Sequence, residues 1–171
     1  MPATPLIVSW NDSVIDPSRA PKGKHLKKFV VLGVPYEIRG DATGKVGRGH
    51  WDEVKDRYAD YLIDMIEENY LPDLKAKLLK REAHSPLDLE RKLASAVHGT
   101  ICHGAMLPYQ TGSMRPIPEM GHYRSPVTNV YLCGSGSHPG FGVSMGPGRN
   151  AAEAICSDLD LDFRATASTK R

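Results

Sequence analysis

The glycine-rich stretch from Tyr131 to Ala152, YLCGSGSHPGFGVSMGPGRNAA, most constrains what this chain can fold into. A short apolar run precedes the glycines, and a helical pattern follows them. Glycine lets backbone N–H groups approach a phosphate closely, and the start of a helix supplies unsatisfied donors and partial positive charge. The order of strand, loop and helix therefore indicates a site for an anionic group.

The spacing of these glycines differs from that of the common nucleotide motifs. Gly134, Gly136 and Gly140 form GxGxxxG rather than GxGxxG, and GPGRNA lacks the Lys-Ser/Thr pair of a P-loop. A self-contained dinucleotide-binding unit also needs a second parallel strand after its helix. Only the short, charged DLDLDFRATASTKR follows here. The glycines therefore either form structural turns or complete a cofactor site whose main part lies elsewhere.

Hydrophobic periodicity predicts a mixture of strands and helices, which indicates an α/β or α+β fold. We expect strands at 5–10, 26–38 and 129–133, the last of them buried. Helices are expected from Trp51 to about Pro72, from Ser85 to about Ala96, and over 146–159. The period of 74–84 fits a strand or a short helix. Residues 98–126 have no sustained period and predict a segment that lines a pocket, and 164–171 predict a frayed tail.

Composition excludes several classes of protein. A net charge of +2, from 22 basic and 20 acidic side chains, gives no argument for binding nucleic acid or an anionic membrane. No window approaches the roughly 18 apolar residues of a membrane span, and the N-terminal residues do not resemble a signal peptide, so we expect a soluble, cytoplasmic chain. The three cysteines follow no disulfide or zinc pattern. His98, Cys102 and His103 lack a suitably spaced fourth ligand, so no metal site is predicted.

The stretch NVYLCGSGSHPGFGVSMGPGRNAA resembles the C-terminal signature of phytoene desaturase-related FAD-dependent oxidoreductases, above all the pyridine nucleotide-disulfide oxidoreductase domain-containing proteins. The likeness continues upstream through IDPSRAPKGKH, SPLDLER, GTICHGAM, RPIP and YRSP, and covers residues 5–158 in order. Members of this family carry an N-terminal GxGxxG for the FAD pyrophosphate, which is absent from this chain. The resemblance therefore implies the C-terminal third of such an enzyme.

This resemblance also implies a division of the chain. Residues 1–126 would form part of a substrate domain with a mixed sheet, 127–163 the flavin-proximal strand, loop and helix of a Rossmann-type FAD domain, and 164–171 a tail. A larger partner chain with the GxGxxG half would complete the fold, as in an enzyme split between two chains. The alternative is that the chain is a fragment of a longer enzyme.

The resemblance assigns cofactor-binding residues by position. Gly134 and Ser135 correspond to residues that approach the phosphates and ribityl chain of FAD. Gly142, Val143 and Ser144 correspond to residues whose backbone N–H groups face the pyrimidine edge of the flavin. Phe141 departs from the family, whose members usually carry glycine there, and we expect it to narrow the substrate pocket or alter the backbone.

Three residues are candidates for contact with the substrate. His138 lies in the glycine loop and is expected either to act as a base or substrate contact or to shape the turn. Tyr109 and Arg115 lie in the irregular segment. Arg115 would pair with an acidic group of the substrate or with a carboxylate of the partner chain, and the alternative is a structural ion pair.

The function implied is that of a small subunit in a heteromeric FAD-dependent oxidoreductase. Such an enzyme would transfer hydride from a small hydrophobic or amine-bearing substrate to the flavin, in a dehydrogenation or desaturation. This agrees with a sequence that has no catalytic triad or carboxylate pair, because the cofactor carries the chemistry. The alternative is a non-catalytic binding or assembly module that keeps the flavoprotein fold without the cofactor.

Overall fold

A computed structural model describes residues 1–140 and 142–168 of the chain. The chain forms two compact units, Met1–Leu89 and the residues from Glu90 onward. We describe each unit by itself. The sequence-based division after residue 126 differs from this division after Leu89, because it separates predicted functions and not compact units. It stays a prediction.

The first unit contains a two-stranded antiparallel sheet of β1 (Leu6–Trp10) and β2 (Lys28–Leu32), with Leu6 opposite Leu32 and Trp10 opposite Lys28. Both strands lie where the sequence predicts strands. β2 is shorter than 26–38 because Gly33 turns the chain with a φ of 75° and Pro35 follows. The described residues contain no further sheet, so the wider mixed sheet remains a prediction.

A short connection joins the two strands. It comprises α1 (Asp12–Ile15) and the 3-10 turn η1 (Pro17–Arg19). The side chain of Asp16 caps η1 by accepting a hydrogen bond from the backbone N–H of Ser18.

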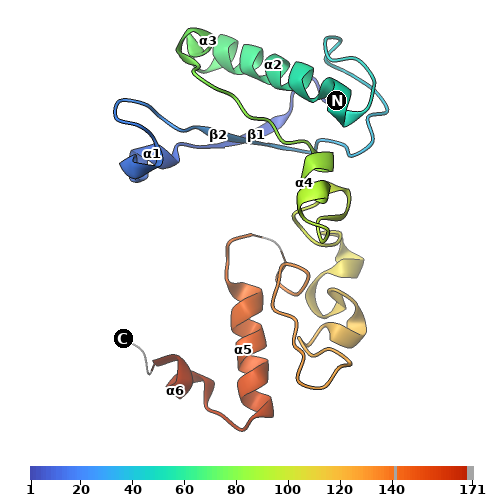
Figure 1. Ribbon diagram of the computed structural model, residues 1–171. Coiled ribbons are helices and arrows are strands. Elements are labelled where there is room, and N and C mark those ends of the chain that lie inside the picture. The colour runs from blue at the N-terminus through green and yellow to red at the C-terminus, as the bar shows by residue number, and fades with distance from the viewer. Residues whose placement is uncertain (141, 169–171) are drawn as a thin grey trace. The chain divides into compact units, whose positions relative to one another are not determined.

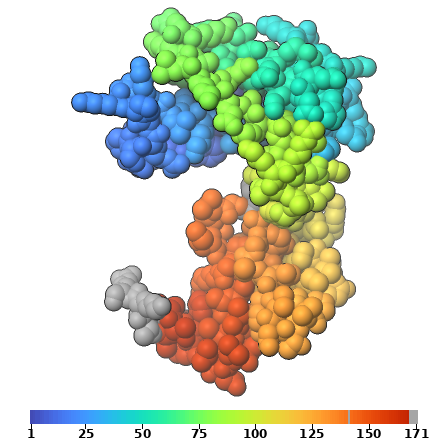
Figure 2. All heavy atoms as spheres, viewed as in Figure 1, coloured from blue at the N-terminus to red at the C-terminus, as the bar shows by residue number. Residues whose placement is uncertain are grey.

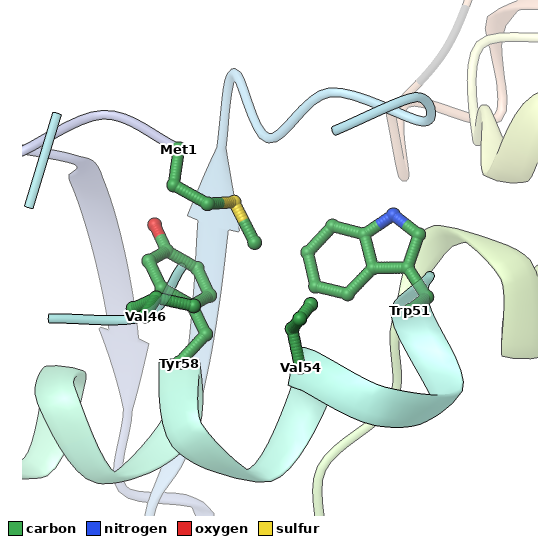
Figure 3. Packing of buried hydrophobic residues seen from close by; sticks show 5 residues of the cluster. All are labelled: Met1, Val46, Trp51, Val54 and Tyr58. Atoms are coloured by element: carbon green, nitrogen blue, oxygen red, sulfur yellow. The ribbon is translucent and has the colours of Figure 1, made fainter. Parts of the chain in front are cut away.

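Helix α2 (Trp51–Asn69) lies along one side of the sheet and supplies most of the core of the first unit (Figure 1). It begins with a capping box between His50 and Glu53. The side chains that point inward recur at three- and four-residue steps, as an amphipathic helix requires. Figure 3 shows the buried cluster that results, which consists of Met1, Val46, Trp51, Val54 and Tyr58.

Two shorter helices follow, α3 (Leu74–Lys77) and α4 (Pro86–Lys92). Ser85 caps α4, because its hydroxyl accepts the N–H of Asp88 at 3.1 Å while the Asp88 carboxylate accepts the N–H of Ser85 at 2.8 Å. This start was predicted. The predicted end at Ala96 is wrong, since the helix stops at Lys92 and the N–H of Ala96 closes a tight turn on Leu93.

The second unit begins at Glu90, within α4, and contains the irregular segment that the sequence predicts at 98–126. Within it lie four 3-10 turns, namely η2 (Val97–Gly99), η3 (Pro108–Gln110), η4 (Gly112–Met114) and η5 (Pro118–Met120). Helix α5 (Gly146–Asp158) confirms the predicted C-terminal helix.

Two predictions for this unit are wrong. Residues 129–133 form no strand; Tyr131 makes one isolated antiparallel bridge with Arg124, and Val130 is 47% exposed because no strand within the described residues lies beside it. The predicted frayed tail contains helix α6 (Phe163–Ser168). Asp162 starts this helix by accepting the N–H of Arg164 at 2.8 Å.

No helix within residues 1–140 and 142–168 has both the length and the apolar character needed to cross a bilayer.

Candidate functional site

Arg115 lies at the centre of the second unit, where it is 1% exposed. Among residues 1–140 and 142–168, its guanidinium donates to backbone carbonyl oxygens alone. Nε and Nη2 bond to Ser135 at 3.2 and 2.9 Å, Nη1 bonds to Ala105 at 2.9 Å and to Gln110 at 3.3 Å, and Nη2 also bonds to Cys102. All three nitrogens of the guanidinium therefore donate hydrogen bonds.

Arg115 therefore joins the glycine loop to the irregular segment before it. The sequence places Arg115 and Ser135 20 residues apart, and the structure brings them together. The side chain of Gln110 strengthens the same cluster, since it accepts the N–H of Ala105 at 2.6 Å and donates to the carbonyl of Pro116 at 3.2 Å. In the described part of the chain, carbonyl groups rather than carboxylates surround the guanidinium.

Two glycines of the loop occupy positions that disfavour a larger residue, one through its backbone conformation and the other through a close neighbour. Gly140 has a φ of 109°, and a Cβ atom there would lie 3.2 Å from Met106 and 3.6 Å from Nε of Arg115. A Cβ atom on Gly146 would lie 2.8 Å from Cγ of Pro139. Glycine at position 140 is thus explained by its positive φ, and glycine at position 146 by close packing.

Other loop positions are open. A Cβ atom on Gly134 or Gly142 would meet nothing within 4 Å, and Val143 is 96% exposed. Within residues 1–140 and 142–168, the backbone N–H groups of Gly134, Ser135, Gly142, Val143 and Ser144 donate no hydrogen bond. These residues therefore fit the predicted cofactor, because free N–H groups at uncovered glycines can approach phosphate and carbonyl oxygens.

His138 and Tyr109 have exposed side chains. The backbone carbonyl of His138 accepts a hydrogen bond from the Tyr123 hydroxyl at 3.1 Å, and that hydroxyl accepts one from Asn150 of α5 at 2.8 Å. Tyr109 is 68% exposed and lies in η3, next to Gln110. No hydrogen bond joins His138 and Tyr109 within the described residues. Phe141 lies outside those residues, so the prediction made for it stays a prediction.

A polar cluster that sequence reasoning missed joins the end of α5 to residues 124–131. Arg124 donates to the Asp158 carboxylate at 2.8 and 2.6 Å, and the Tyr131 hydroxyl donates to it at 2.8 Å. The hydrogen bond from Arg124, and then that from Tyr131, lowers the pKa of Asp158. The space-filling view shows this stretch of chain beside α5 (Figure 2). No local pattern reveals the cluster, because its partners lie 34 residues apart.

A shallow depression of about 300 Å³ borders this cluster. It is lined by His122, Tyr123, Arg124, Asn150, Glu153 and Ala154. None of the predicted site residues contributes to this lining.

The described residues contain no group of three or more histidine, cysteine or acidic side chains arranged to hold a metal ion. The ring Nδ1 of His103 lies 3.0 Å from the carbonyl of Ser95, and the backbone carbonyl of Cys102 accepts from Arg115. Cys102 therefore belongs to the packing around Arg115, and His103 contacts the turn at Ser95.

Comparison with curated proteins confirms the resemblance that the sequence indicates. Over about nine-tenths of its length, the chain is homologous to phytoene desaturase-related oxidoreductases. It is 43% identical over 156 residues to pyridine nucleotide-disulfide oxidoreductase domain-containing protein 2 of Rattus norvegicus, which covers 91% of this chain and 25% of that protein.

Two further relatives are named for their reactions. The chain is 31% identical over 147 residues to a phytoene desaturase (lycopene-forming) of Paracoccus sp., covering 84% of this chain and 26% of the relative. It is 28% identical over 153 residues to one subunit of the limonene dehydrogenase of Castellaniella defragrans, covering 87% and 26%. The chain thus spans about a quarter of the length of these relatives. No protein-family model and no solved structure matches it.

Proposed function

We propose that the chain is part of an FAD-dependent oxidoreductase that dehydrogenates or desaturates a small hydrophobic or amine-bearing substrate. The observation that carries the proposal is the homology, over about nine-tenths of the chain, to proteins named as dehydrogenases and desaturases. The open glycine loop with its free N–H groups supports the same conclusion.

When bound, FAD would accept the hydride that leaves a C–H bond of the substrate. The task of this chain is to hold and orient the cofactor. The N–H groups of Gly134 and Ser135 would bind phosphate oxygens. Those of Gly142, Val143 and Ser144, just before the N-terminus of α5, would stabilise negative charge on the flavin.

Arg115 would act here as a positioning residue. Its two hydrogen bonds to the carbonyl of Ser135 hold the first half of the loop. The exposed side chains of Tyr109 and His138 would contact the substrate or the rest of the enzyme. The names of the relatives, which refer to limonene and phytoene, favour a hydrophobic substrate.

The remainder of the enzyme would carry the GxGxxG half. The relatives are about four times as long as the matching stretch, and one of them is named as a subunit. We propose that a larger partner chain supplies the nucleotide-binding half; the alternative is that this chain is a segment of one longer polypeptide.

The experiment is to purify the tagged chain from its native cells together with its bound polypeptides and to record the absorption spectrum. We expect flavin bands and release of FAD on denaturation. Val143→Pro removes one free N–H, and should weaken FAD binding by about tenfold, as expected for one lost hydrogen bond. Val143→Ala keeps that N–H and serves as the matched control. A stable, colourless complex would contradict the proposal and would support the non-catalytic assembly module.

A further inference from the structure

One face of the β1–β2 sheet is apolar and exposed. Successive side chains of a strand point to opposite faces, so the register assigns each residue to a face. Ile7 and Val31 form one cross-strand pair, and Val31 packs against the core that α2 supplies. The residues on either side of Ile7 and of Val31 in their strands therefore point away from α2.

This outer face carries three cross-strand pairs: Leu6 with Leu32, Val8 with Val30, and Trp10 with Lys28. Its apolar members are 37–64% exposed, with Leu6 at 64% and Trp10 at 46%. Lys28, at the end of the face, forms an ion pair with Asp12. We call these six residues the outer sheet face.

Within the described residues the sheet has two strands, and α2 covers the face opposite to the outer sheet face. A two-stranded sheet in water is marginally stable unless further strands or a helix pack against it, and in the described part of the chain α2 supplies such packing on one face only. A contiguous apolar patch on a sheet commonly marks an interaction surface. The single charge on the outer sheet face is already paired within the chain, so the occupant needs no compensating charge and must itself present apolar side chains.

We propose that the outer sheet face binds the remainder of the oxidoreductase, through an apolar strand or helix face of the polypeptide that carries the nucleotide-binding half. This inference rests on the proposed function for the identity of the partner. The length of the relatives supports it over a second copy, because about three-quarters of each relative lies outside the stretch that this chain matches. That missing portion is available to cover the face.

The test places a photo-reactive benzoylphenylalanine at Val8, in the centre of the outer sheet face, in the tagged full chain expressed in its native cells. Irradiation should cross-link position 8 to peptides of a polypeptide bearing the GxGxxG sequence, identified by mass spectrometry. The same probe at Leu79 serves as the control, because Leu79 is 74% exposed but belongs to neither strand. Position 79 should give no such cross-link.

A second pair of variants keeps the result independent of the probe. Val8→Thr with Val30→Thr retains the β-branched shape and leaves the fold of the isolated chain intact, but would bury two hydroxyl groups in the complex. We expect the double variant to weaken the complex by about tenfold or more, while Leu79→Thr leaves its affinity unchanged. Cross-links from position 8 to a second copy, or none at all, would overturn the proposal. So would equal affinity for the double variant and the control.

The flavin spectrum separates this inference from the proposed function. A yellow complex whose affinity is unchanged by the double variant would support the proposed function and refute the outer sheet face as a docking surface. A colourless complex that contains the GxGxxG chain and is weakened by the double variant would refute the proposed function and support the docking surface.

Discussion

The hydroxyl of Tyr58 is buried in the core of the first unit and has no hydrogen-bond partner within the described residues. Burial, followed by the charges of Tyr61 and Asp41, raises the pKa of Tyr58 to about 12. The fold therefore favours the protonated hydroxyl. The stability linked to this group is fully present below the ordinary pKa of 10.0 and is lost as the pH rises toward 12.

Tyr58→Phe should reduce this alkaline loss of stability. Near neutral pH the variant should be as stable as the wild type, or more stable by about 1 kcal/mol, because it removes a buried polar group without a partner. Urea unfolding at about pH 8 and about pH 11 would measure both effects. Tyr70→Phe is the control, since Tyr70 is 74% exposed. An unchanged alkaline slope in Tyr58→Phe would refute the assignment.

Arg115 shows that a buried charge can be held by backbone carbonyls. Its removal would leave the carbonyls of Cys102, Ala105 and Ser135 without their donor. Arg115→Met, which has a similar length, should destabilise the second unit by about 3 kcal/mol or more. Amide hydrogen exchange of residues 102–140 would report the loss locally.

The control for Arg115 is an arginine of the same unit. Arg149 lies in α5 with 64% of its side chain exposed and forms a long contact with Glu153. Arg149→Met should change stability by no more than about 0.5 kcal/mol. Equal effects of the two substitutions would show that the carbonyl contacts of Arg115 contribute little.

At the scale of elements, the start of α4 combines a cap with an ion pair. The Asp88 carboxylate accepts from Ser85 and also from Nζ of Lys55 in α2, at 2.8 Å. Burial alone would raise the pKa of Asp88, but the hydrogen bonds from Lys55 and Ser85 outweigh it and lower that pKa. The cap thus also anchors α4 to the long helix.

Ser85→Ala should cost about 1 kcal/mol of stability, because the first turn of α4 loses its hydroxyl acceptor. Chemical denaturation followed by circular dichroism would measure the change. Ser157→Ala in α5, at an exposed position, should leave stability almost unchanged. A loss of similar size in both variants would argue against the capping role.

Elements also differ in how well local sequence predicts them. The periods of α2 and α5 are long and regular, so their positions follow from the sequence. The run 129–133 has the composition of a strand, but a strand exists only beside another strand, and the described residues place none there. Helix α6 was missed because a charged terminal stretch resembled a tail, although Asp162 is an ordinary helix cap.

At the scale of the whole molecule, the two units contain separate stabilising networks. The buried cluster of the first unit is built from residues between Met1 and Tyr58, whereas the contacts of Arg115 join residues between Cys102 and Ser135. Substitutions without shared partners usually act independently.

We therefore expect Val54→Ala, at a fully buried position, to destabilise the first unit by about 2 kcal/mol. Tryptophan fluorescence would follow this unit alone, because both tryptophans, Trp10 and Trp51, belong to it. Hydrogen exchange around Arg115 should stay unchanged. Faster exchange there would show that the units unfold as one.

The sequence by itself determined the family, the long helices, the sites of both strands and the presence of a glycine-rich loop before the last long helix. The family follows from the likeness of its motifs to those of known oxidoreductases, whereas the helices and strands follow from local periodicity and the residues permitted at a given backbone conformation, which can be read along the chain. Only the tertiary structure showed that Arg115 binds carbonyls, that Asp158 joins Arg124 and Tyr131, and that one sheet face is uncovered. Such features arise between residues far apart in sequence, and no local pattern encodes which distant group will satisfy a buried donor.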